Sequence, residues 1–186
     1  MNPTHKALRD GTRDAHERVD AAFANFDLAD RQGYAAFLAA HAEVLLPLEA
    51  ALDAAGAAQV VPDWETRKRG TLIQEDLAHL RDAASPTLPD KAPEAWRLET
   101  PEQIAGALYV LEGSRLGGKF LARQIPAGFP RAYLASDQPA EKWRNLLDRL
   151  DGILYEPARL HSALAAAHLA FAAFERSAVR WTRIKD

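Results

Sequence analysis

The 186-residue sequence contains no cysteine. Without thiols the protein has no disulfide bonds, no cysteine nucleophile and no metal site with thiolate ligands. Any metal ion would have to be bound by His, Asp or Glu side chains. The absence of cysteine therefore excludes thiol catalysis and thiolate metal sites.

Long uncharged segments are missing as well. No run approaches the roughly 18 to 20 uncharged residues of a transmembrane helix, and the polar start MNPTHKALRD does not resemble a signal peptide. We therefore expect a cytoplasmic protein with no membrane partner. The net charge of −3 gives no reason to expect nucleic acid, because binding to phosphate backbones normally requires clustered Lys and Arg.

The sequence also lacks sustained alternation of apolar and polar residues, which is the pattern of half-buried β-strands. Apolar residues instead recur three and four positions apart, as on amphipathic helices. The hydrophobic fraction of 48% and the chain length suit one domain with a buried core. We predict an all-α fold, a compact single-domain bundle of six or seven helices over residues 1–186.

Local signals place the first three helices. The first carries an apolar stripe that begins at Leu8, and the second covers residues 31–54, where Gly56 would end it. Pro47 predicts a kink or a break inside the second helix, because proline donates no amide hydrogen bond. A third helix is expected over residues 71–83, before a proline-rich loop.

The fourth helix has the clearest start signal. Thr100 can cap it, Pro101 suits the first helical position, and Gln103 completes a Thr-x-x-Gln capping box. Pro126 would close it. The fifth and sixth helices are expected over residues 139–150 and 157–181.

The segment LRDGTRDAHERVD places Arg9, His16 and Asp20 on one face of the first helix. Asp20 lies one turn after His16, so its carboxylate can accept a hydrogen bond from the imidazole nitrogen that does not bind a metal. Arg9 lies two turns before His16, roughly 10 Å along the axis. This separation suits a heme whose iron binds His16 and whose propionate reaches Arg9. A half-buried, hydrogen-bonded histidine is the simpler alternative.

His41, His79, His161 and His168 give weaker signals than His16. None of them lies in the HExxH pattern of zinc-dependent proteases. We expect His161 and His168, which are two turns apart on the last helix, to pack in the core.

Three glycines interrupt the middle of the fourth helix, in the segment LEGSRLGGKFL. Each costs about 1 kcal/mol of helix stability relative to alanine, so their presence needs a structural reason. Gly113 and Gly117, four positions apart, open one face of the helix to a ligand, and Gly118 gives local freedom to bend. Close packing against another helix is the alternative. A flat macrocycle between this face and His16 is the simplest object that would need both helices.

These segments together resemble a known family. LRDGTRDAHERVD and GALYVLEGSRLGGKFLARQI are similar to the two signature helices of the heme oxygenases, and most resemble the bacterial branch that supplies biliverdin to bacteriophytochromes. LIQEDLAHL is similar to the same branch. The resemblance implies a heme oxygenase-like bundle with heme as both cofactor and substrate. O2 and an external electron donor, such as ferredoxin or a reductase, would cleave heme to biliverdin, CO and ferrous iron, and a bacteriophytochrome would receive the biliverdin.

The resemblance also implies roles for individual residues. His16 would be the axial ligand of the iron, Asp20 would support it, and Arg9 would bind a propionate. Gly113 and Gly117 would lay backbone over the opposite side of the heme. The further residues expected to contact the heme are Thr12, Tyr109, Gly118 and, as a second propionate partner, Arg144.

Ser114 departs from the pattern of the animal heme oxygenases, which carry an aspartate at this position. In those enzymes the aspartate organises the distal water network that supplies protons. Ser114 carries no charge, so hydroxyls, backbone groups or another side chain must order the water. We expect Ser114 to take part in catalysis together with Gly113 and Gly117, and the source of the protons stays open.

Two other functions fit parts of the pattern. A carrier or sensor that binds heme without cleaving it would share His16 and Arg9. A non-heme di-iron oxidase on a helical scaffold would need several inward carboxylates and histidines. Its candidates here are Glu43, Glu75, Asp76 and His79, without a repeated Glu-x-x-His.

Overall fold

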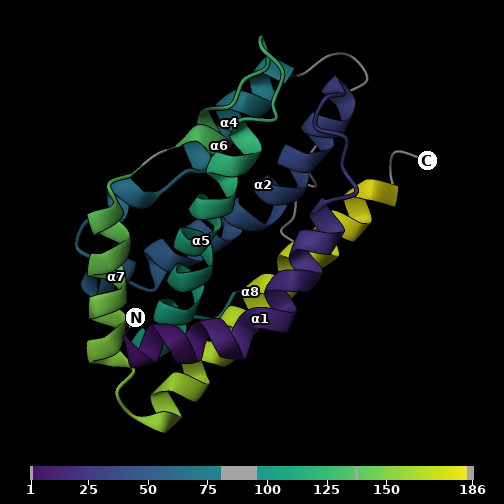
Figure 1. Ribbon diagram of the computed structural model, residues 1–186. Coiled ribbons are helices and arrows are strands. Elements are labelled where there is room, and N and C mark those ends of the chain that lie inside the picture. Colours follow the sequence, from purple (N-terminus) through teal and green to yellow (C-terminus); the bar gives the residue numbers. More distant parts are fainter. Residues whose placement is uncertain (1, 81–95, 137, 184–186) are drawn as a thin grey trace.

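The computed structural model describes residues 2–80, 96–136 and 138–183 (Figure 1). All the regular elements within these ranges are helices, so the predicted all-α fold is confirmed. The long helices are α1 (Pro3–Phe23), α2 (Arg31–Ala54), α4 (Gly70–Leu80), α5 (Pro101–Ala122), α7 (Ala140–Ile153) and α8 (Pro157–Arg183). The short elements are α3 (Ala57–Val60), the 3-10 helix η1 (Trp64–Arg67) and α6 (Ala132–Ala135).

Helix α8 is the main packing partner in the bundle. It contacts α1, α2 and α5, and its inward stripe is rich in alanine, with Ala163, Ala167 and Ala170 fully buried. Figure 1 shows α1 beside α8, α5 crossing the middle of the molecule, and α7 on the other side of α5. Both helices with ligand-binding signals, α1 and α5, are therefore set against the same long helix.

Two glycines allow the close approach of these helices. A β-carbon at Gly11 would lie 2.7 Å from the side chain of Leu164, where α1 crosses α8. A β-carbon at Gly106 would clash with the backbone carbonyl of Ala163, where α5 crosses α8. Both positions thus favour glycine for packing, although glycine lowers helix propensity.

The alanine stripe also corrects one expectation about α8. His161 and His168 are exposed rather than packed in the core. Small alanine side chains occupy the inward positions, so the two histidines fall on the solvent side of the helix.

Helix α2 continues through Pro47 from Arg31 to Ala54, so the predicted break is wrong. The helix is buried over most of its length, and packing in the bundle offsets the one missing amide hydrogen bond. Gly56 ends it as predicted, with φ of +80°. Among the described helices, α2 is the one long and apolar enough to cross a membrane by length and composition, and 72% of its most apolar window is buried in the bundle.

The remaining boundaries agree with the sequence within a few residues. The capping box of α5 is present, with Thr100 accepting a hydrogen bond from the backbone of Gln103 at 3.3 Å. Helix α5 ends at Ala122, before Pro126. Helix α4 begins at Gly70, and the predicted end of this helix, at residue 83, lies outside the described residues.

Candidate active site

His16 projects from α1 with 58% of its side chain exposed. Its Nδ1 lies 3.1 Å from Oδ2 of Asp20, one turn further along the helix. The ring packs edge-on against Phe171 of α8, with the two ring centroids 5.7 Å apart. The predicted pair of His16 and Asp20 is therefore present. Because Asp20 engages Nδ1, Nε2 is the ring nitrogen that a metal would bind.

A buried link joins α1 to α5. Thr12 and Tyr109 are 2% and 8% exposed, and the Thr12 hydroxyl donates a hydrogen bond to the Leu8 carbonyl at 2.8 Å. Tyr109 meets α1 through the His5 ring, with the two ring centroids 6.3 Å apart. Burial raises the pKa of Tyr109, while the nearby Thr12 side chain and the charge of Arg9 oppose that rise. Arg9 lies near them with half of its side chain exposed.

One face of α5 carries no covering helix in the described part of the chain. A β-carbon at Gly117 would have no heavy atom within 4 Å, and one at Gly113 would meet only the Trp143 ring, at 3.7 Å. Leu116 and Phe120 lie on the same face and are 62% and 65% exposed. Leu116 and Phe120 are strongly exposed apolar side chains, and they lie beside glycines that leave the helix surface uncovered. Such a combination indicates a surface that binds a ligand. Close helix packing does not explain Gly113 and Gly117.

Gly118 has a different role from its neighbour Gly117. It is buried, and a β-carbon there would lie 3.2 Å from the carbonyl oxygen of Leu134 in α6. It therefore faces away from the uncovered side of α5. The structure does not place Gly118 with the other predicted heme contacts, because one residue along a helix turns the side chain by about 100°.

Helix α7 brings a residue to this face that the sequence did not single out. The Trp143 ring lies beside Gly113 and packs against Tyr109 and His5, with centroid distances of 5.9 and 5.8 Å. Its neighbour Arg144 is 67% exposed, and its nearest ion-pair partner is Glu141 at 3.7 Å. The described contacts therefore connect Trp143, rather than Arg144, to α5.

Ser114 is held by a buried arginine that sequence reasoning missed. Arg69 is 4% exposed, and its Nη2 donates hydrogen bonds to Oγ of Ser114 and to the carbonyl of Leu111, each at 2.8 Å. Ser114 Oγ in turn donates to the Leu111 carbonyl at 2.7 Å. The serine hydroxyl is therefore oriented by a fixed positive charge. The backbone N–H of Arg69 donates to Glu49 at 2.7 Å, which anchors this residue to α2.

A second buried network holds the side of α5 opposite the uncovered face. Glu112, 2% exposed, accepts hydrogen bonds from Arg67 Nη1 at 2.8 Å and from Arg115 Nε at 3.1 Å. Both arginines are buried as well. The signal in the sequence was the charge-rich segment WETRKRG together with LEGSR, which pattern reasoning assigns to a solvated surface.

The residues proposed for a di-iron centre have separate structural roles. Glu43 accepts a hydrogen bond from Arg180 at 2.6 Å, and Asp76 accepts from two backbone N–H groups at the start of α6. His79 bonds through Nδ1 to the carbonyl of Glu75 at 2.8 Å. No group of three side chains suited to a metal ion occurs among the described residues. The geometry therefore does not support the di-iron alternative.

The chain matches a known family over most of its length. The family model named Heme oxygenase matches residues 2–179. A heme oxygenase from Xanthomonas campestris pv. campestris (strain 8004) is 34% identical over 155 residues, which cover 78% of this chain and 88% of the relative.

Two solved structures share the fold. The NO- and CO-bound heme oxygenase from Neisseria meningitidis has a TM-score of 0.80 at 21% identity and covers 98% of this chain and 94% of its own. Heme oxygenase from Leptospira interrogans has a TM-score of 0.74 at 17% identity and covers 96% of this chain and 100% of its own. With the family model matched over nearly the whole length, the chain belongs to the heme oxygenase family, whose members degrade heme.

Proposed function

We propose that this chain binds heme between α1 and α5, where Nε2 of His16 would bind the iron and the Gly113–Gly117 face would contact the porphyrin. One observation carries the proposal: Gly117 faces open space, whereas Gly106 and Gly118 of the same helix are packed against backbone of α8 and α6. The exposed side chains of Leu116 and Phe120 give the apolar contact that a porphyrin needs.

The polar groups around this face fit a dianionic macrocycle. Arg9 lies near Tyr109 at one end of the face and is our proposed propionate partner, with the exposed Arg144 as a weaker second candidate. Asp20 would orient the His16 ring and make Nε2 a stronger ligand. Gly118 is left out of the contact set because it packs against α6.

Heme is both cofactor and substrate in this proposal, because its iron supplies the site of O2 reduction and its ring is cleaved to biliverdin, CO and ferrous iron. Electrons come from ferredoxin or a reductase. The protein contributes position, exclusion of water and protons. We assign the ordering of the proton-supplying water to Ser114. Nη2 of Arg69 donates a hydrogen bond to its Oγ at 2.8 Å, and a serine held by a buried cation can orient water without carrying a charge.

The test is a hemin titration of the wild type, His16→Ala and His161→Ala. His161 is an exposed histidine on α8 and serves as the matched control. The wild type and H161A should show a Soret band that decays into a broad red absorption when reductant is supplied in air, and H16A should lack the ligand signature. Heme that binds to the wild type and persists under a competent reductant would instead assign the carrier or sensor role.

We further propose that the biliverdin is passed to a bacteriophytochrome. The support is the segment LIQEDLAHL together with Ser114, which resemble the phytochrome-associated branch. A coupled assay tests this: heme, reductant and this protein should convert a bacteriophytochrome apoprotein into its photoactive form. Failure of the product to assemble with the apoprotein, where authentic biliverdin does, would refute the assignment.

A further inference from the structure

Trp143 of α7 lies at one end of the proposed heme site and contacts both of its helices. Cη2 of the indole ring would be 3.7 Å from a β-carbon at Gly113, and the ring packs against Tyr109 of α5 at a centroid distance of 5.9 Å. On α1 the ring meets His5 edge-on, with the two centroids 5.8 Å apart. One side chain therefore closes the Gly113 end of the face that carries Gly113 and Gly117.

A buried arginine fixes the backbone beside this ring. Arg67 is 3% exposed, and its Nη1 donates to the carboxylate of Glu112 at 2.8 Å, while its Nη2 donates to the carbonyl of Lys142 at 3.1 Å. Glu112 directly precedes Gly113, and Lys142 directly precedes Trp143. The donors of a guanidinium group lie in a rigid planar fork, so this one group holds the start of α7 at a set distance from Gly113.

Helix α7 is also bonded to the start of α1. Nδ2 of Asn2 donates a hydrogen bond to the carbonyl of Leu147 at 3.2 Å, and the hydroxyl of Thr4 donates to the carboxylate of Asp151. The helix that carries Trp143 is thus tied to both α1 and α5, and the ring is a fixed part of the bundle.

The two ends of the uncovered face differ in the space that they leave. At Gly117 a β-carbon would have no heavy atom of the described chain within 4 Å, and Phe120 beyond it is 65% exposed. Gly113 and Gly117 are about 6 Å apart along the helix axis, which is less than the width of a porphyrin. A macrocycle on this face must therefore extend past one of the two glycines, and the Trp143 ring directs it past Gly117.

The substituents of heme make its edges unequal. The two propionates lie on neighbouring pyrroles, so a single cation such as Arg9, which lies near Tyr109, can bind either of them. The two choices differ by a quarter turn of the ring. One choice brings an edge with methyl and vinyl groups against a wall beside the cation, and the other brings the second propionate there. Desolvation of an ionised carboxylate by an apolar indole is unfavourable.

We propose that Trp143 is a specificity-determining residue, which selects the in-plane rotation of heme that places a methyl- and vinyl-bearing edge against the indole. This inference rests on the proposed heme site and adds to it the residue that chooses among the orientations that a single propionate contact allows. The rotation also decides which of the four meso carbons of the ring lies at the open Gly117 end, so Trp143 sets which biliverdin isomer forms.

The ring methyl signals of heme in ¹H NMR spectra of the hemin-loaded full chain report this rotation. Ferric iron shifts each methyl signal according to its position relative to the imidazole plane, so each orientation gives its own set of signals. The wild type should show one predominant set. Trp143→Leu, which removes the indole but keeps an apolar side chain, should lower the ratio of the major to the minor set about tenfold. Trp143→Phe, with a shorter ring, should lower it by a smaller factor.

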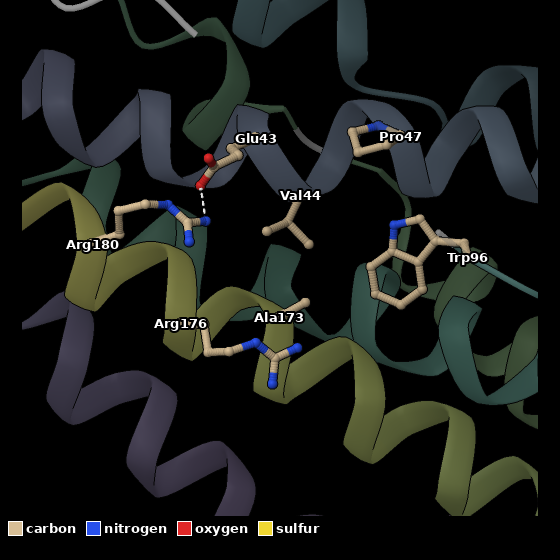
Figure 2. Close-up of a pocket in the computed structure, with 7 residues that line it drawn as sticks. All are labelled: Glu43, Val44, Pro47, Trp96, Ala173, Arg176 and Arg180. Carbon is tan, nitrogen blue, oxygen red and sulfur yellow. Dashed lines mark hydrogen bonds and ion pairs between the residues drawn. The ribbon is translucent and has the colours of Figure 1, made fainter. Parts of the chain in front are cut away.

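Trp96→Phe is the matched control. Trp96 is a second half-buried tryptophan, and it lines a separate pocket between α2 and α8 (Figure 2). W96F should keep the methyl pattern of the wild type. The biliverdin isomers that the variants form, separated by chromatography, should change in the same order as the methyl ratio.

A purely structural role for Trp143 gives a different result. Substitution would then lower the stability of the heme-free chain while the methyl ratio stays at its wild-type value, and that outcome would overturn the inference, as would equal changes in W143L and W96F. Should W143L fail to fold, judged by urea unfolding without heme, the comparison of W143F with W96F decides alone. A wild type that binds no hemin would overturn the proposed heme site itself, and this inference with it.

Discussion

Gly117→Ala should make the heme-free protein more stable and the heme complex weaker. A β-carbon at this position has no heavy atom within 4 Å, so alanine adds helix propensity without a clash. The gain is about 1 kcal/mol, which raises the melting temperature by about 2–4 °C for a domain of this size. The same methyl group would occupy the space where the helix backbone meets the heme. Overpacking of about 1–3 kcal/mol there lowers heme affinity about tenfold.

Two other glycines provide matched controls for this experiment. Gly152→Ala, near the end of α7, also faces open space and should stabilise the protein slightly without changing heme affinity. Gly106→Ala would place its methyl against the Ala163 carbonyl and should destabilise the fold by about 2 kcal/mol or more. The assays are denaturant unfolding without heme and a Soret titration. A G117A protein that binds hemin as tightly as G152A would refute the placement of heme on this face.

The remaining predictions concern individual polar groups. Asp20→Asn should lower heme affinity about tenfold, measured by Soret titration, because it weakens the hydrogen bond that supports His16. It should change the free energy of unfolding, measured in urea, by less than about 1 kcal/mol, because both side chains are exposed. Ser114→Ala should slow biliverdin formation at unchanged hemin affinity, whereas Arg69→Met should reduce both rate and stability; equal turnover in S114A would contradict the proton role. Burial lowers the pKa of His41 to about 4, so stability should be full above about pH 6.5 and fall as the pH drops toward 4; His41→Phe should flatten that dependence in unfolding curves recorded from pH 4 to 7.

Local signals in the sequence predicted the fold well because they act over a few residues. The start of α5 follows from Thr100, whose capping box needs only Gln103 three positions later. The His16–Asp20 pair likewise follows from helical spacing. The break predicted as one outcome at Pro47 does not occur, because the packing that keeps α2 continuous comes from other helices and is not visible in the local sequence.

The missing parts of the site depend on contacts between distant segments. Arg69 and Ser114 are 45 positions apart, and they meet where α4, which begins just after Arg69, and α5 both pack against α6. Gly117 and Gly118 are adjacent and identical in the sequence, yet one faces open space and the other faces α6. Helical periodicity defines their relative directions but not which direction is covered, and only the positions of the other helices decide that.

The arrangement of α5 explains how a glycine-containing helix can serve as one wall of a ligand site. Glycines on the uncovered face lower helix propensity by about 1 kcal/mol each, and around Gly117 no heavy atom lies within 4 Å of a β-carbon position to compensate. On the opposite face Glu112 bonds two buried arginines, Arg67 and Arg115, which fix the position of α5 against its neighbours. Removal of one partner from such a network would leave a buried charge without a counter-charge, which destabilises the folded protein by about 3–5 kcal/mol. The buried network holds one face of α5 in place. The opposite face can therefore carry glycines, whose exposed backbone leaves room for a flat substrate.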